Sequence, residues 1–470
     1  MNDAHTLTRH HHNNRYLILI TAVASLGGLL FGFDIAVISG VLPFVQKQFS
    51  FSAAQQGWFV SSALIGCIVG VAFSGELSDR FGRKKLLVLA ALLFFFSALG
   101  CTLLPSSFWI IAARMVGGIG IGVASIIVPL YISEIAPAAI RGRLVTCYQL
   151  AVTMGILFAY LTNAGLLDFS LNHQGTSTSS LLDFLYVTEV WRGMFSVLLF
   201  PSLLFLAGLI LVPESPRWLI QQARTEEAIS ILSRINHDNV QARRDVDEIY
   251  KSLKSEKGTY KELLEPGMRK GLLIGLLLPF LSQFSGINAI IYYGPTILNN
   301  AGITMSNSLL SQIIFGLAIV IFTFIAIWKV DKVGRRKLYL IGTVGATISL
   351  FLTGLCFYLG YTGFWFLLPV LLFLAGFAFS IGPLKFVVAA EIFPNKIRGR
   401  AMALSIMVMW IADTIVGQLT PVSLRELGTA GTFWFFAFFC LVGFFVILKM
   451  LPETKGKSLE QIEDFWKGMH

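Results

Sequence analysis

Long apolar runs alternate with short polar connections along almost the whole chain. A helix needs about 20 apolar residues to cross a hydrocarbon core of ~30 Å, and twelve runs reach that length. The pattern therefore predicts an all-α membrane protein with twelve transmembrane helices. The predicted spans are roughly 17–41, 56–78, 86–104, 108–132, 144–167, 191–212, 271–298, 308–328, 338–359, 366–390, 401–421 and 432–451.

Composition narrows the class of protein further. Hydrophobic residues make up 55% of the chain and charged residues 13%, about half of the roughly 25% charged residues of a typical soluble domain. A chain this apolar cannot cover a water-facing surface, which excludes a soluble enzyme and a disordered protein. The five cysteines are scattered through apolar runs, so we expect neither a disulfide framework nor a cysteine metal site.

No other motif indicates a cofactor or a metal. The GGIGIG run at 117–122 lies inside a span without a preceding strand, where small residues favour helix packing over nucleotide binding. His10, His11 and His12 lie in a polar tail, which we interpret as solvated. We therefore expect no cofactor, no metal site and no enzyme activity.

Charge indicates the topology. The net charge is +10, but the basic residues occupy short connections between spans rather than a polybasic arm, so we expect no nucleic-acid partner. The connections at 79–85, 140–143, 213–270, 331–337 and 396–400 are basic, whereas those at 42–55, 105–107, 299–307 and 360–365 carry almost no charge. The positive-inside rule then places both termini and the middle segment in the cytoplasm. Short termini and the lack of an N-x-S/T sequon favour a bacterial inner membrane.

The chain also contains an internal repeat. DRFGRKK at Asp79 recurs as DKVGRRK at Asp331, and EIAPAAIRGR at Glu134 recurs as EIFPNKIRGR at Glu391. Two six-helix halves joined by a linker are typical of a duplicated transporter. The predicted units are a cytoplasmic tail at 1–15, a six-helix bundle at 16–212, a linker with short helices at 213–270, a second bundle at 271–452 and a tail at 453–470.

Four ionisable residues stand out inside the predicted spans: Asp34, Arg114, Lys385 and Asp413. Each costs roughly 2.5–3.5 kcal/mol on the insertion scale, so each needs a role. Asp34 lies nine residues before Pro43 and Arg114 nine residues after Pro105. At ~1.5 Å per residue the two side chains lie about 13 Å below the outer surface, at equal depth, and can pair.

Two roles fit this first pair. Arg114 keeps its proton and would hold Asp34 ionised, so that Asp34 could bind a proton on one side of the membrane and release it on the other. The alternative is a static ion pair that locks two spans together. Lys385 and Asp413 form a second candidate pair at slightly different depths. They could neutralise each other, contact substrate hydroxyls, or use Lys385 to bind a substrate carboxylate.

Glycine and proline cluster in spans 1, 7 and 10 and predict interrupted helices around a central site. The clusters are Gly27, Gly28 and Gly32, then Pro279, Gly286, Gly294 and Pro295, then Gly376, Gly382 and Pro383. Amide and aromatic side chains near these breaks suit a neutral polyhydroxylated solute, because amides donate and accept hydrogen bonds and rings cover C–H faces. These side chains are Gln149, Gln283, Asn288, Tyr292 and Tyr293.

Taken together, the motifs resemble those of the sugar porter family of the major facilitator superfamily over nearly the whole chain. The matching strings are GxxxDRxGRKK at 75–85, EIAPAAIRGR at 134–143, PESPRWL at 213–219, QFSGINAIIYY at 283–293, EIFPNKIRGR at 391–400 and PETKGKSLE at 452–460. The resemblance implies alternating access of two bundles and a cytoplasmic gate of breakable salt bridges. By motif position the gate would use Asp79, Arg83, Glu134, Arg143, Asp331, Arg335, Glu391 and Arg400.

The resemblance also implies site residues. Gln149, Gln283, Asn288 and Trp410 match the family's sugar contacts. Asp34 and Arg114 match the coupling pair of proton-driven members, whereas facilitative members have Asn in place of the aspartate. This favours symport.

Several positions depart from the family pattern. The GPxxW motif of span 10 reads Gly382-Pro383-Leu384-Lys385-Phe386, and WxxN in span 11 reads Trp410-Ile411-Ala412-Asp413. Ser282, Ile319 and Met409 also replace polar residues that are usual in the family. Ordinary glucose or xylose specificity is therefore in doubt. We expect the substrate-binding set to be Gln149, Gln283, Asn288, Tyr292, Gly382, Lys385, Phe386, Trp410 and Asp413.

The sequence as a whole predicts a proton-coupled importer of a monosaccharide or related polyol that functions as a monomer in the lipid bilayer. Facilitative uniport, or a carrier of an acidic sugar or cyclitol that uses Lys385, is the alternative. A drug/proton antiporter would have a more apolar pocket, and a transporter-like sensor would have a long signalling tail.

Overall fold

The computed structural model of the chain describes residues 14–137, 140–174, 180–236, 238–254, 261–265, 268–361, 364–393 and 397–453. Across these ranges the protein is helical, and no strand occurs in them. Twelve helical segments are long and apolar enough to cross a membrane, which confirms the number of spans predicted from hydropathy. His10, His11, His12 and the predicted tail from residue 454 onward lie outside the described residues.

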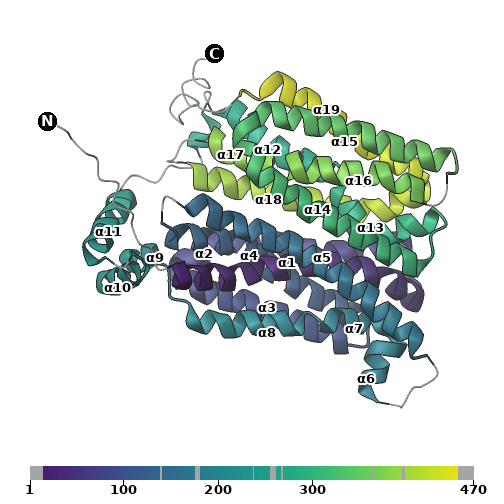
Figure 1. Cartoon of the computed structure of the whole chain (residues 1–470), viewed down its shortest axis with the longest axis horizontal. Helices are drawn as coiled ribbons and strands as arrows, with labels where there is room; N and C mark the ends of the chain where they lie inside the picture. Colours follow the sequence, from purple (N-terminus) through teal and green to yellow (C-terminus); the bar gives the residue numbers. More distant parts are fainter. Residues whose placement is uncertain are drawn as a thin grey trace.

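The first six spans form one half of the molecule, in purple to blue in Figure 1. Here α1 packs mainly on α5, and α4 packs on both α2 and α3. Span 6 consists of two helices, α7 and α8. The helices of this half are α1 (Asn14–Phe49), α2 (Ala53–Phe81), α3 (Arg83–Leu103), α4 (Ser107–Ile135), α5 (Arg141–Asn172), α6 (Leu181–Asp183), η1 (Phe184–Thr188), α7 (Val190–Ser196) and α8 (Leu199–Leu211).

The predicted linker does carry short helices, which gather at one end of the molecule (Figure 1). They are α9 (Pro216–Gln221), α10 (Thr225–Asn236), α11 (Asn239–Lys254) and the 3-10 turn η2 (Glu262–Leu264). Trp218, Leu232 and Ala242 belong to a small apolar core of their own. The Arg234 guanidinium lies 4.0 Å from the ring centre of Tyr16, so α10 is fastened to the beginning of α1. We call this end the linker end and the opposite end the far end.

The last six spans form the second half, in green to yellow in Figure 1, alongside the first. α15 packs on α19, and α12 packs on α18. The elements of this half are α12 (Arg269–Gln283), α13 (Ile287–Asn300), α14 (Met305–Val333), α15 (Arg335–Tyr358), η3 (Phe364–Phe366), α16 (Leu367–Gly376), η4 (Phe377–Ile381), α17 (Gly382–Ile392), α18 (Arg398–Glu426) and α19 (Gly428–Met450).

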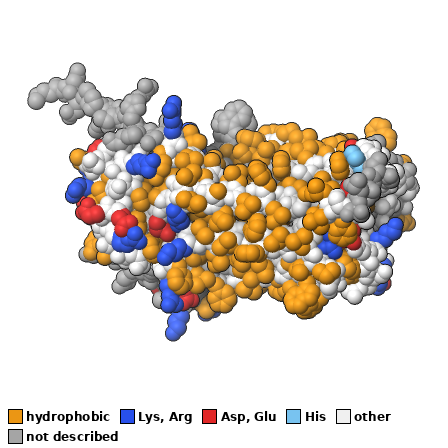
Figure 2. All heavy atoms as spheres, turned by 90° about the horizontal axis from the view of Figure 1, so that it is seen from below, with side chains coloured by type: hydrophobic (Ala, Val, Ile, Leu, Met, Phe, Trp, Pro, Cys, Tyr) orange, Lys and Arg blue, Asp and Glu red, His pale blue; other side chains and the backbone are white. Residues whose placement is uncertain are grey.

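Apolar side chains cover the middle of the outer surface. Figure 2 shows hydrophobic side chains over the centre of one face, with most Lys, Arg, Asp and Glu side chains near the two ends. Large side chains such as Phe200 (75% exposed), Ile210 (76%) and Phe108 (68%) face outward. A surface of this kind is stable against hydrocarbon rather than water.

The predicted interruption of span 1 is wrong, because α1 continues unbroken from Asn14 to Phe49. Its glycines instead allow helices to approach closely. A Cβ at Gly32 would lie 1.9 Å from the carbonyl oxygen of Val152, and a Cβ at Gly28 would lie 2.7 Å from the ring of Tyr148. Small residues at such contacts let membrane helices pack backbone to backbone.

The interruptions predicted in spans 7 and 10 are present. Gly286 separates α12 from α13 and has a φ of +83°, a conformation that glycine adopts without strain. Span 10 contains a π-helical turn, Phe377–Ile381, directly before Gly382. Such turns often occur where a helix is adapted to a functional site.

The two halves are joined by hydrogen bonds at the far end. Ser39 of α1 donates to Gln312 of α14 (2.8 Å), and Ser61 of α2 donates to Gln418 of α18 (2.9 Å). The amide nitrogen of Gln418 donates back to the carbonyl oxygen of Ala54 (3.0 Å). These hydrogen bonds hold the two halves together, so the far end is closed.

Candidate functional site

Asp34 and Arg114 are buried at the interface between the halves, 5% and 3% exposed. They line one cavity, which we call the interface cavity. Its walls come from α1, α2 and α4 of the first half and from α13 of the second half. The lining residues are Asp34, Ile35, Ile38, Val60, Ala63, Leu64, Arg114, Ile121 and Tyr292.

The predicted direct contact between these two charges is not formed. None of the ion pairs among the described residues joins Asp34 to Arg114, although the two charges interact electrostatically. Arg114 instead donates from Nε to the carbonyl oxygen of Phe59 (3.1 Å) and lies over the rings of Phe59 (5.4 Å) and Phe195 (5.7 Å). Its Nη1 is buried without a partner in the described structure. Asp34 therefore faces a fixed positive charge without being locked to it.

Polar side chains beside the break in span 7 form a second cluster. Asn288 donates to Gln283 across Gly286 (2.9 Å). Tyr292 donates to Oδ2 of Asp413 (2.9 Å), and Tyr293 donates to the carbonyl oxygen of Gly417 (2.6 Å). Two tyrosines therefore fasten α13 to α18. The break predicted from glycine and proline thus brings the amide pair and the tyrosines together.

Lys385 and Asp413 do not form the predicted ion pair. Both are buried, 7% and 1% exposed, and near enough to attract each other. The Lys385 ammonium lies over the rings of Phe386 (5.1 Å) and Phe377 (5.8 Å). Asp413 takes its hydrogen bond from Tyr292, and its Oδ1 is buried without a partner in the part of the chain described. A lysine over aromatic faces gains a cation–π interaction.

Trp410 lies next to this cluster, and Gln149 shows no contact with it. Trp410 is 1% exposed, its ring centre is 5.6 Å from that of Phe31, and its Nε1 has no partner among the described residues. Gln149 is exposed, whereas its neighbour Tyr148 is buried against Gly28. The sequence interpretation missed Tyr148 and Phe31, because an aromatic residue in a span carries no signal of its own there.

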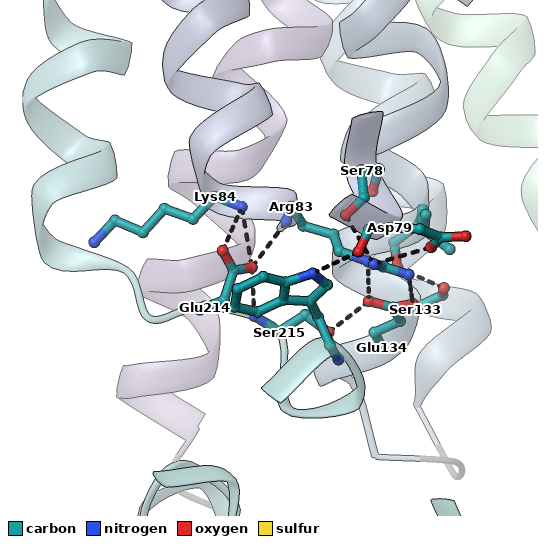
Figure 3. Close-up of polar contacts among 10 residues, drawn as sticks. Ser78, Asp79, Arg83, Lys84, Ser133, Glu134, Glu214 and Ser215 are labelled. Carbon is teal, nitrogen blue, oxygen red and sulfur yellow. Dashed lines mark hydrogen bonds and ion pairs between the residues drawn. The ribbon is translucent and has the colours of Figure 1, made fainter. Parts of the chain in front are cut away.

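Three of the four predicted gate residues of the first half, Asp79, Arg83 and Glu134, form one polar cluster at the linker end (Figure 3). Arg83 is bidentate to Glu134, with 2.9 Å for each contact, and lies 3.3 Å from Asp79. Ser215 also donates to Glu134 (2.5 Å). All these residues belong to one half or to the linker that follows it. Arg143, predicted to join them, is exposed, and within the described residues it has no hydrogen bond or ion pair with them.

Glu214 extends this cluster in a way that the sequence interpretation missed. Its carboxylate accepts hydrogen bonds from the backbone N–H groups of Arg83 (2.9 Å) and Lys84 (3.1 Å), the first residues of α3. A carboxylate at this position satisfies free helix N–H groups and complements the helix dipole. Trp218 also donates to the carbonyl oxygen of Asp79 (3.0 Å). The PESPRWL motif carried the signal, but no role was assigned to it.

The second half repeats this arrangement. Arg335 lies 3.1 Å from Glu391, and its backbone N–H donates to Glu453 (2.9 Å). Gly82 and Gly334 precede the capped helices with φ angles of +96° and +99°. Arg400 lies in the first turn of α18. The side chain of Asp331 lies outside the described residues.

The charged clusters at the linker end form ion pairs inside each half. Arg83 pairs with Glu134 in the first half, and Arg335 pairs with Glu391 in the second. Hydrogen bonds across the halves occur at the far end. The structure is therefore closed at the far end.

Twelve spans in two related halves, with buried charges where the halves meet, define a secondary transporter of the major facilitator fold. A model of the sugar (and other) transporter family matches residues 20–466, and the chain belongs to this family. Membership makes the protein a multi-pass membrane transporter and not an enzyme.

Named relatives cover nearly the same length. The chain is 42% identical to the arabinose-proton symporter of Bacillus subtilis (strain 168), over 97% of this chain and 96% of the relative. It is 38% identical to the D-xylose-proton symporter of Escherichia coli (strain K12), over 97% of each chain. The partially occluded inward-open structure of the xylose transporter XylE from E. coli superposes with a TM-score of 0.83 at 36% identity, covering 95% of this chain and 100% of that one.

Proposed function

We propose that the protein is a proton-coupled symporter that imports a monosaccharide or related polyol by alternating access of its two halves. The observation that carries this proposal is the interface cavity. Asp34 is buried in it opposite Arg114, without an ion pair, and the cavity is walled by both halves. A carboxylate there can exchange a proton and affect how the halves meet. The names of the arabinose and xylose relatives support the same function.

The proposed substrate site lies beside this cavity in the second half. Gln283, Asn288 and Trp410 supply amides and an indole next to a broken helix, which suits a neutral polyol. We include Gln149, Tyr292, Gly382, Lys385, Phe386 and Asp413 in this proposed site. Gln149 would approach the substrate from the first half.

The charged clusters at the linker end are proposed as the cytoplasmic gate. Asp79, Arg83 and Glu134, with their counterparts Arg335 and Glu391, would hold the two halves together when the far end opens. Their pairing inside each half in this closed-far-end structure is what a released gate would show. Arg143, Asp331 and Arg400 are proposed members by motif position.

The remaining proposals concern topology and assembly. We infer that the linker end faces the cytoplasm, with both termini there and the far end outside, because the basic connections lie at the linker end. The proposed units are 1–15, 16–212, 213–270, 271–452 and 453–470. The proposed setting is a bacterial inner membrane, with the monomer as the functional unit.

One observation favours a second candidate. The Lys385 ammonium has cation–π contacts but no carboxylate within ion-pair distance in the described structure. An acidic sugar or cyclitol could provide that partner. The two candidate functions, transport of a neutral substrate and transport of an acidic one, therefore predict different responses in the assay described next.

The test is the external pH of lightly buffered, energy-starved cells that express the protein, pulsed with sugars, cyclitols and uronic acids. Alkalinisation with a neutral sugar or cyclitol would support symport. A response to uronic acids alone, after correction for acid leakage, would support the Lys385 alternative. Equilibration of labelled sugar without any pH change would indicate uniport and contradict the proposal.

A further inference from the structure

Tyr292 joins two sets of buried charges that belong to different halves. Its side chain lines the interface cavity together with Asp34 and Arg114. Its hydroxyl donates to Oδ2 of Asp413 at 2.9 Å. Tyr292 is 1% exposed, so water cannot easily replace either contact. The hydroxyl has one hydrogen to donate, and in this structure Asp413 receives it.

Several titratable and charged groups surround Asp413. Lys385 of α17 attracts it, and Asn288 of α13 lies beside it. Tyr293 of α13 is within electrostatic range of both Asp413 and Arg114 of α4. Cys67 of α2 is within range of both Asp413 and Asp34 of α1. The two aspartates therefore share one buried neighbourhood across the interface.

We propose that Asp413 is a positioning residue for proton coupling, which acts through Tyr292 to set the pH range in which Asp34 exchanges its proton. This inference rests on the proposed proton-coupled sugar transport. While Asp413 holds the Tyr292 hydrogen, Asp34 receives no hydrogen bond from that hydroxyl. A neutral side chain at position 413 is a weaker acceptor than an ionised carboxylate, so in its place the hydroxyl can turn within the cavity and donate to the Asp34 carboxylate. A hydrogen bond to the charged form favours that form.

The negative charge of Asp413 acts in the same direction. A second buried carboxylate nearby disfavours ionisation of Asp34. Removal of Asp413 should therefore shift proton release from Asp34 towards acidic pH. The positive charge of Lys385 acts oppositely.

The test is sugar binding by the purified full-length protein from acidic to alkaline pH. Intrinsic tryptophan fluorescence provides the signal, and the probe is the panel sugar that gives the largest cell alkalinisation, with arabinose tried first. We expect Asp413→Asn to move the pH midpoint of binding to lower pH by about one unit, the size expected for one hydrogen bond to a charged group. Lys385→Met should move it to higher pH. Asp413→Glu should keep the wild-type midpoint, and Asp247→Asn on α11 is the charge control.

Tyr292→Phe tests whether Asp413 acts on Asp34 through the Tyr292 hydroxyl. In that background the shift caused by Asp413→Asn should be at least halved, because no hydroxyl remains to turn. An undiminished shift would overturn the role of Tyr292. An unchanged or higher midpoint in Asp413→Asn would overturn the inference.

Two other results have defined meanings. If Asp413→Asn does not accumulate in the membrane, Asp413→Ser is used with the same expectations. Loss of all binding in folded Asn and Ser variants would mean that Asp413 acts only as the sugar contact included in the proposed site, and it would contradict the positioning role. If sugar binding by the wild type does not depend on pH, the proposed proton coupling itself fails. If sugar binding by the wild type depends on pH and Asp413→Asn shows the same dependence, only this inference is contradicted.

Discussion

At the residue scale, the central feature is a buried carboxylate that faces an arginine without touching it. Arg114 is held by the Phe59 carbonyl and two aromatic rings, so its charge stays in place whether or not Asp34 is ionised. Depth along two helices predicted that these side chains share a level of the membrane. Depth does not give the direction in which each side chain points, so the missing direct contact could not be predicted. For the same reason, depth along the helices did not predict that Asp413 contacts Tyr292 rather than Lys385.

Asp34→Asn should separate exchange from uphill transport. The amide has nearly the same shape but carries no proton, so we expect counterflow of labelled sugar to persist while concentrative uptake is lost. The measurement is both fluxes in the same membrane vesicles, with Asp168→Asn on α5 as the control. Wild-type accumulation by Asp34→Asn would exclude Asp34 as the proton carrier.

Gln283→Ala should weaken sugar binding. It removes one predicted sugar contact. It also removes the oxygen that accepts the hydrogen bond from the Asn288 side-chain amide. Loss of about 1.4 kcal/mol, within the range for one or two hydrogen bonds, raises the Kd about tenfold. Equilibrium binding by the purified protein measures this, with Gln222→Ala after α9 as the control. An unchanged Kd would remove Gln283 from the site.

At the scale of elements, glycine serves two purposes that look alike in a sequence. Gly286 provides a positive φ and ends a helix, as predicted, whereas Gly32 removes a Cβ from a contact with Val152 inside a continuous helix. Only the partner helix distinguishes the two uses, and that partner is far away in the sequence. The capping carboxylates Glu214 and Glu453 were equally hard to assign, because each acts on a distant helix.

Gly82→Ala should destabilise the linker end of the first half. The residue has a φ of +96°, and a Cβ there would lie 2.3 Å from the Glu214 carboxylate. Strain of this kind costs about 1–3 kcal/mol. We expect a lower melting temperature in detergent than for the wild type. Gly75→Ala is the matched control, because a Cβ there has open space. Equal melting temperatures of the two variants would contradict the proposed constraint.

At the scale of the whole molecule, the internal repeat predicted two similar halves, and the capped helices after Gly82 and Gly334 show that similarity in detail. The contacts between halves were not predictable in the same way. They depend on which end is closed, and one sequence must support both states. Ser39, Ser61, Gln312 and Gln418 gave only the weak signal of polar residues inside spans.

The double variant Ser39→Ala, Ser61→Ala should open the far end more often. Each lost hydrogen bond contributes about 0.5–1.5 kcal/mol, so the equilibrium between the two states should move roughly tenfold or more. Spin-label distances across the far end measure the change. The control is Thr162→Ala, whose hydroxyl bonds only to its own helix. An unchanged distance distribution would mean that other contacts close this end.

The central claim is that a proton gradient drives sugar uptake through this protein. The most direct measurement is the accumulation of labelled sugar in proteoliposomes that contain only the purified protein, under an imposed membrane potential. With one proton per sugar, 100 mV should support roughly 50-fold accumulation, which a protonophore should abolish. Sugar that only equilibrates, at the same rate with and without the potential, would contradict the account.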